Sequence, residues 1–200
     1  MHRFVYLASS SPRREQLLEQ IGVDYELLLP DAHEDAEALE AARPNEAPET
    51  YALRVTLAKL RAARERRQRR ELPEAPILCA DTTVALGARI LGKPRDAQDA
   101  HAMLAALAGR THRVISAVAV ASGRRTLRAV NVSRVRFAPI PAAQIERYIA
   151  SGEPFGKAGG YAIQSQIAAF VRHIEGSYSS IMGLPLYETA QLLRQARLAF

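Results

Sequence analysis

The chain has 200 residues, of which 48% are hydrophobic, and this suits one large domain with a substantial buried core. Its formal charge is +6, but six arginines and one glutamate fall within residues 61–70, so the basic balance alone does not indicate nucleic-acid binding. Cys79 is the only cysteine and no apolar run is long enough to cross a bilayer. These facts exclude an internal disulfide, a cysteine metal cluster and a membrane partner, so we expect a cytoplasmic protein.

The first stretch predicts a buried strand over residues 4–8 and a helix that begins at Ser11 and Pro12. Arg13 and Arg14 fall in the first helical turn, where the helix dipole prefers anions, so two cations there cost stability unless something negative binds. Serine hydroxyls and free N–H groups at the same point indicate a site for a ligand with several negative charges, such as a polyphosphate. A capped surface helix with solvated arginines explains these residues equally well.

Residues 23–29 predict a second strand, and the acidic, irregular residues 31–40 follow it. Glu34 lies there between a histidine and an aspartate. Such a cluster near a phosphate site would suit Mg²⁺, which prefers oxygen ligands. A solvated loop explains the same composition, and spacing alone favours the loop.

A long helix is predicted from Pro48, and it ends in the arginine run at residues 61–70, which complements the negative end of the helix dipole. We interpret that run as a solvated helix end and not as a nucleic-acid patch. Of the 27 basic residues only Lys59, Lys93 and Lys157 are lysines. A chain so rich in arginine uses lysine where a compact ammonium is required, unless the three positions are chance.

Residues 76–80 predict a short buried strand, and Asp81 follows it directly. A carboxylate at the C-terminal end of a buried strand is where α/β folds place their chemistry, although a structural aspartate that caps a turn is equally consistent. Residues 84–86 and 90–91 predict a hairpin, which would bring Lys93 back near Asp81.

The remaining residues predict helices over 97–107, 142–150 and 186–196, strands over 111–121, 126–137, 161–164 and 167–174, a glycine-rich loop over 151–160 and a turn-rich passage over 176–185. This order of elements predicts a mixed α/β fold in a single domain, residues 1–200, with a long mixed sheet flanked by helices. The sequence contains no Walker phosphate loop, dinucleotide-binding glycine turn, zinc-binding helix or nucleophile elbow.

Several short motifs occur in one order: LASSSPRR at 7–14, ADTT at 80–83, LGKP at 91–94, GRTH at 109–112, KAGGYAIQ at 157–164 and GLPL at 183–186. Each is weak alone, but together they resemble the Maf family of nucleoside triphosphate pyrophosphatases over nearly the whole chain. The resemblance implies a hydrolase that cuts a nucleoside triphosphate between the α and β phosphates with Mg²⁺ or Mn²⁺, and that forms a homodimer. It also implies two lobes with a central cleft, similar to the inosine triphosphatase fold.

The resemblance implies a substrate-binding set made of Ser9, Arg13, Arg14, Lys59, Lys93, Thr82 and Gln164. It assigns Asp81 as proton acceptor and Glu34 as an acidic site residue, with Glu34 and Asp81 as the metal ligands. Whether Asp81 deprotonates the attacking water or holds the metal stays open. Ala162 and Ser165 stand where the family usually has glycine.

Thr82, Gln164 and Arg13 match a branch of the family that prefers dTTP and UTP. Three other functions remain as alternatives. One is a pyrophosphatase for 7-methyl-GTP, against which Thr82 and Gln164 argue, or for inosine-type triphosphates. Another is a non-catalytic nucleotide-binding regulator of cell division, against which an intact Asp81 argues. The last is a nucleic-acid-binding module built on residues 61–70.

Overall fold

The computed structural model describes residues 2–31, 34–35 and 38–200, so part of the expected acidic loop, residues 32–33 and 36–37, lies outside the described residues. The strands are β1 (Val5–Leu7), β2 (Tyr25–Leu27), β3 (Ile77–Leu86), β4 (Arg89–Leu91), β5 (Thr111–Ser122), β6 (Arg125–Phe137) and β7 (Val171–Glu175). The α-helices are α1 (Pro12–Gln20), α2 (Pro48–Arg69), α3 (Ala97–Leu107), α4 (Ala142–Ala150), α5 (Tyr178–Met182) and α6 (Leu186–Gln195). Three 3₁₀ helices are η1 (Ala38–Glu40), η2 (Ala158–Gly160) and η3 (Gln166–Phe170).

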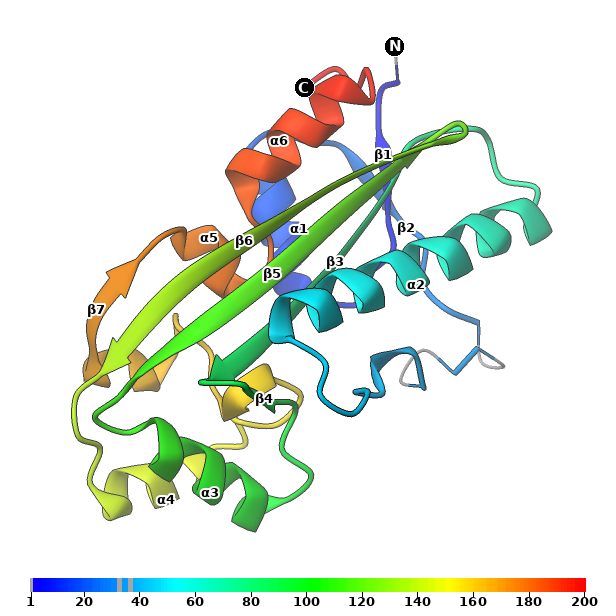
Figure 1. Cartoon of the computed structure of the whole chain (residues 1–200). Helices are drawn as coiled ribbons and strands as arrows, with labels where there is room; N and C mark the ends of the chain where they lie inside the picture. The colour runs from blue at the N-terminus through cyan, green and yellow to red at the C-terminus, as the bar shows by residue number, and fades with distance from the viewer. Residues whose placement is uncertain (1, 32–33, 36–37) are drawn as a thin grey trace.

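The strands of the described residues form one sheet in the order β2-β1-β3-β5-β6-β7, with β4 paired to β3 (Figure 1). β1 runs parallel to β2 and β3, whereas β3, β5, β6 and β7 pair antiparallel along the sheet. The predicted mixed α/β fold is therefore confirmed. Among the described residues, no helix combines the length and apolar composition that crossing a bilayer requires.

Alternation along β3 explains the layers around the long sheet, because successive side chains of a strand point to opposite faces. Leu78 and Ala80 pack in one core with residues of α1 and α6, whereas Ile77 and Cys79 pack in another with residues of α2. Figure 1 shows α2 on one side of the long strands and α1 and α6 on the other. Both faces of the sheet are thus covered around β3.

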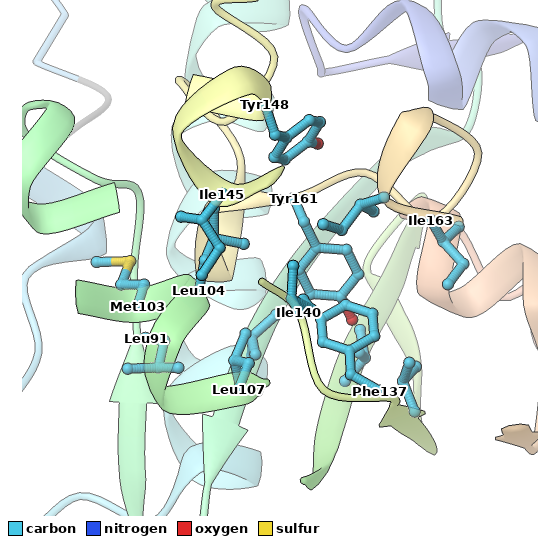
Figure 2. Packing of buried hydrophobic residues seen from close by; sticks show 14 of the residues in the cluster. Leu91, Met103, Leu104, Leu107, Phe137, Ile140, Ile145, Tyr148, Tyr161 and Ile163 are labelled. Carbon is cyan, nitrogen blue, oxygen red and sulfur yellow. The ribbon is translucent and has the colours of Figure 1, made fainter. Parts of the chain in front are cut away.

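A separate apolar cluster lies where α3 and α4 pack against the ends of the long strands. Figure 2 shows Phe137 and Tyr161 packed beside Leu107 and Ile140 in this cluster. The centroids of the Phe137 and Tyr161 rings lie 5.0 Å apart in an edge-on arrangement. This cluster and the cores around α1, α2 and α6 form the two lobes that the sequence resemblance implied.

Strand β3 is paired with β5 along nearly its whole length, but its other edge has partners only near the two ends. β1 pairs with it as far as Leu78, and β4 pairs with it from Val84 to Leu86. In the described part of the chain, no strand covers the edge between Leu78 and Val84. Asp81 lies in the middle of this open edge.

Three predicted boundaries were wrong. β3 does not end before Asp81 but continues to Leu86, because the β-branched residues after Asp81 extend the pairing with β5. Residues 161–164 are irregular and not a strand, since Tyr161 turns into the apolar cluster. Residues 166–170 form η3, and only β7 after it is extended.

Gly159 in η2 sets how closely the glycine-rich loop approaches β3. Its φ is +69°, and a Cβ atom built there would lie 2.9 Å from both γ-carbons of Val84, a stiff side chain in the core. Gly156, three residues earlier, has φ +73° but no heavy atom within 4 Å of such a Cβ. Glycine is therefore required at position 159 by both the backbone conformation and the lack of space, and at position 156 by the backbone conformation alone.

We expect Gly159→Ala to lower the free energy of unfolding by about 2–4 kcal/mol, the sum of a left-handed backbone and an overpacked contact. The matched control, Gly156→Ala, should lose only about 1–2 kcal/mol, because it carries the backbone cost alone. Urea denaturation of both variants measures the difference. Equal losses would contradict the close contact with Val84.

Candidate active site

A cavity of about 680 Å³ opens between the lobes at the unpaired edge of β3, a size typical of small-molecule sites. The structure brings all nine residues expected at the site to its wall: Ser9, Arg13, Arg14, Glu34, Lys59, Asp81, Thr82, Lys93 and Gln164. Lys157 lines the same cavity, so all three lysines of the chain gather there. This placement agrees with the idea that lysine is kept where a compact ammonium is needed.

Asp81 is a buried carboxylate of the cavity, and the residue is 7% exposed. Its Oδ1 accepts a hydrogen bond of 2.7 Å from Nζ of Lys59, which reaches across from α2. Burial raises the pKa of the Asp81 carboxyl, and the ammonium of Lys59 opposes that rise. A carboxylate with a raised pKa beside an ammonium is a suitable proton acceptor.

Glu40, at the end of η1, joins this charged group. It belongs to the acidic residues 31–40, but neither motif nor spacing distinguished it from the other carboxylates there. Its Oε1 accepts from Lys59 at 2.8 Å and its Oε2 from Lys93 at 2.9 Å. The two lysines lower the pKa of the Glu40 carboxyl although burial opposes them. Asp81 and Glu40 therefore converge on the ammonium of Lys59, and Glu40 also links Lys59 to Lys93.

Glu34, the expected metal carboxylate, has other partners. Its two oxygens accept from the guanidinium of Arg66, with Nε at 2.9 Å, and Oε1 also accepts from Arg69 at 2.7 Å. The hydrogen bonds from Arg66 lower the pKa of the Glu34 carboxyl to about 2. The structure thus pairs Glu34 with two guanidinium groups and places Glu40, not Glu34, beside Asp81.

The arginine run at residues 61–70 was interpreted as a solvated helix end, and this was only partly right. The run does end α2, but five of its six arginines donate to protein oxygen atoms: Arg64, Arg66, Arg67, Arg69 and Arg70. Arg66 is only 4% exposed. The arginines of the run bind neighbouring segments to α2, so most of their guanidinium groups already have hydrogen-bond partners within the protein.

Arg13 and Arg14 lie in the first turn of α1, as predicted, and both reach the turn after α5. Arg14 donates from Nε to the carbonyl of Gly183 and from Nη1 to Ser9 Oγ, both at 2.9 Å, and Arg13 donates to the carbonyl of Met182 at 3.3 Å. Burial lowers the pKa of the Arg14 guanidinium. Ser11 occupies the N-cap position, but its side chain makes no capping hydrogen bond. The arginines are thereby held at the N-terminus of α1, where anions are favoured.

Gln164 follows a loop that two tyrosines hold in place. Tyr161 Oη lies 2.6 Å from Nε2 of buried His112, and burial lowers the pKa of that histidine to about 4. Tyr148 Oη accepts from the N–H of Ala162 at 3.2 Å and lies 2.9 Å from Ser165 Oγ. The loop closes without glycine at these two positions, because neither residue has a positive φ. Within the described part of the chain, no hydrogen bond engages the amide of Gln164, which is exposed to the cavity.

Comparison with known proteins gives a family match over residues 4–196, to the family described as Maf-like protein. A protein named dTTP/UTP pyrophosphatase from Cupriavidus pinatubonensis is 62% identical over 200 residues and 100% of both chains. Proteins of the same name from Polaromonas sp. and Burkholderia pseudomallei are 62% identical over 195 residues and 61% over 199 residues, covering 98% of this chain and 96% and 95% of the relatives. A solved nucleoside-triphosphatase / dITP/XTP pyrophosphatase from Mycobacterium abscessus aligns with 68% of this chain and 75% of its own, at 15% identity and a TM-score of 0.40, too distant a likeness to carry an argument.

The pairing of Glu34 with Arg66 predicts a pH-dependent contribution to stability. The pKa of Glu34 is depressed from 4.5 to about 2, so its stabilisation is present above its ordinary pKa and is lost as the pH falls toward 2. We expect Glu34→Gln, in the presence of a metal chelator at pH 7, to lower the free energy of unfolding by about 2–3 kcal/mol. The amide carries no charge and offers one acceptor oxygen where the two carboxylate oxygens accept from Arg66 and Arg69.

The loss should shrink between pH 5 and pH 3, in urea titrations of wild type and variant at each pH. Glu26→Gln, at an exposed carboxylate of β2, is the control and should change stability little at any pH. Unchanged stability of Glu34→Gln in chelator would contradict the fastening role of Glu34.

Proposed function

The chain belongs to the Maf family, and we propose that it hydrolyses dTTP and UTP between the α and β phosphates, releasing nucleoside monophosphate and pyrophosphate. The single observation that carries this proposal is the position of Asp81. Its carboxylate, which burial makes more basic, lies at the open edge of β3 in a cavity lined by lysines and arginines. A proton acceptor among cations is what water attack on a phosphoryl group requires.

The cations of the cavity support this proposal. Arg13 and Arg14 lie at the N-terminus of α1, and Lys59 and Lys93 lie around Glu40 on the wall of the same cavity. Charge builds on the leaving pyrophosphate during the reaction, and positive groups fixed in advance stabilise it. In this assignment the phosphates take the place of Glu40 as the partner of the two lysines.

Asp81 then orients the attacking water and accepts its proton. Lys59 holds the carboxylate by one oxygen, Oδ1, at 2.7 Å. Thr82 and Gln164, on the wall of the same cavity, are assigned to the nucleobase. Gln164 offers both an amide donor and an amide acceptor, so it can match the O4 and N3–H edge of thymine and uracil.

A divalent cation, Mg²⁺ or Mn²⁺, fits the donor set of this site, with Asp81 and Glu40 as its protein ligands. Their carboxylates already converge on one positive charge, the ammonium of Lys59. Among the described residues, no three acidic, histidine or cysteine side chains gather closely enough to hold a metal alone. One or two carboxylates completed by water and substrate phosphates is the arrangement that Mg²⁺ favours. When bound, the ion would supply Lewis-acid stabilisation of the phosphoryl charge.

We further propose that the protein acts in the cytoplasm as a homodimer, without a nucleic-acid partner. The lone cysteine, Cys79, is buried as a free thiol, which suits a reducing compartment. Val130 and Val132 are 37% and 41% exposed on β6, where β7 does not cover the strand, and such apolar side chains suit a contact between copies. The engagement of five arginines of residues 61–70 with protein oxygens supports the absence of nucleic-acid binding.

The proposed activity predicts a ranking of substrates. With Mg²⁺ or Mn²⁺, kcat/KM should be higher for dTTP and UTP than for 7-methyl-GTP, ATP or ITP, and the products should be monophosphate and pyrophosphate. Pyrophosphate release across this panel, with chromatography of the nucleotide products, measures it. A preference for 7-methyl-GTP, or release of single phosphate, would overturn the proposal.

The proposed base predicts that Asp81→Asn lowers kcat for dTTP by ~10²-fold or more, because removal of a general base costs this order of rate. Asparagine keeps the size of the side chain, so the circular dichroism spectrum should be unchanged and the thermal midpoint should not fall steeply. Glu26→Gln should retain full turnover and serves as the control. Near-wild-type turnover of Asp81→Asn would show that Asp81 is not the proton acceptor.

A further inference from the structure

Thr82 faces away from the charged group that contains its neighbour Asp81. The two residues are adjacent on β3, so their side chains leave opposite faces of the sheet. Asp81 turns to α2, where it meets Lys59, whereas Thr82 turns to the face that carries α5. There Thr82 lies directly opposite Ser116 of β5 in the antiparallel register, and its Oγ1 is 2.7 Å from Ser116 Oγ.

Ser116 has a second partner, and that partner fixes the direction of the hydrogen bonds. Ser116 Oγ lies 2.7 Å from the carbonyl oxygen of Ser180 in α5. A carbonyl has no proton to give, so the single hydroxyl proton of Ser116 goes to Ser180. Ser116 is fully buried, so water does not compete for this proton.

The contact between Thr82 and Ser116 then requires a proton from Thr82. Two hydroxyl oxygens 2.7 Å apart repel each other unless a proton lies between them, and that of Ser116 is already used. Thr82 therefore donates to Ser116. Its other oxygen neighbour, the carbonyl of Gly183, is 3.4 Å away and outside the usual range for an O–H···O bond.

We propose that Ser116 is a positioning residue for substrate specificity, which presents the hydroxyl of Thr82 to the cavity as a hydrogen-bond acceptor and never as a donor. Thr82 lines the cavity and is partly exposed, so the lone pairs of its hydroxyl oxygen are open to a ligand. The relay Thr82–Ser116–Ser180 contains only uncharged groups, so the same polarity holds over the whole pH range of activity.

An acceptor in this place selects one class of pyrimidine. At neutral pH, thymine and uracil carry a proton on N3, whereas cytosine carries a lone pair there. An acceptor facing that edge pairs with the first two bases and is left opposite another acceptor with the third. In this arrangement Thr82 takes the N3 proton and the amide N–H of Gln164 donates to O4. The inference rests on the proposed hydrolysis of dTTP and UTP, and it names a group that disfavours CTP and dCTP relative to UTP and dTTP.

The test compares kcat/KM for UTP and CTP on the same variant. Loss of overall activity through a packing defect affects both nucleotides, so their ratio reports on base recognition alone. In Ser116→Ala the hydroxyl of Thr82 loses its acceptor and can rotate to donate to cytosine N3. The ratio of kcat/KM for UTP to that for CTP should therefore fall by about tenfold, the scale of one hydrogen bond. Ser116→Thr keeps the hydroxyl, and the wild-type ratio should return.

Two further variants complete the test. Ser133→Ala removes another fully buried serine hydroxyl, on β6, which bonds Asn131 and the loop before α5, and the ratio should stay at the wild-type value. Thr82→Val keeps the shape of Thr82 but removes the acceptor, so UTP should lose more than CTP. This variant tests the same relay even if Ser116→Ala does not fold.

The outcomes separate this inference from the proposed function. If the wild type hydrolyses neither UTP nor dTTP, the proposed function fails. If the wild type hydrolyses both but Ser116→Ala keeps the wild-type UTP:CTP ratio, the role of Ser116 is overturned while the function stands. An unchanged ratio in Thr82→Val likewise overturns the acceptor role of Thr82.

Discussion

The incomplete pairing of β3 is the constraint on which the site depends. β1 ends after Leu7 and β4 begins at Arg89, so a stretch of β3 has one strand partner, β5, and one open edge. Because the backbone of β3 stays extended and tied to β5, the side chains along that edge are held rigidly. Asp81 and Thr82 owe their places in the cavity to this arrangement and not to a flexible loop.

Because β3 is pleated, two consecutive residues, Asp81 and Thr82, place charged groups on one face of the sheet and neutral hydroxyls on the other. On the face of α2, Asp81 belongs to a group of alternating charges with Lys59, Glu40 and Lys93. On the opposite face, Thr82 belongs to a relay of neutral hydroxyls. The charged side chains thus lie where we expect the phosphates to bind. The oriented hydroxyl groups lie where we expect the nucleobase to bind. A strand with period 2 provides this division without any special backbone geometry.

Side chains of helix α2 hold the segment after β2 in place through hydrogen bonds and ion pairs. Arg66 and Arg69 hold Glu34, Tyr51 donates to the carbonyl of Glu40, and Lys59 binds the Glu40 carboxylate. Three arginines of residues 61–70, Arg66, Arg69 and Arg70, are thus engaged in this attachment. Their energetic role is to pair a buried guanidinium with a carboxylate, because leaving either alone away from water would be costly.

The sequence by itself determined the elements whose signals are local. The start of α1 with Arg13 and Arg14, the β3–β4 hairpin and the three rare lysines follow from turn chemistry, periodicity and composition within a few residues. The place of Asp81 directly after a predicted buried strand already indicated a site, and the resemblance to a family added Thr82 and Gln164. Only the tertiary structure decided that Asp81 lies within a strand, that Glu40 and not Glu34 accompanies it, and that Ser116 directs Thr82. These contacts join residues 19 to 64 positions apart. Their partners are chosen by strand register and helix docking, which no short window of sequence encodes.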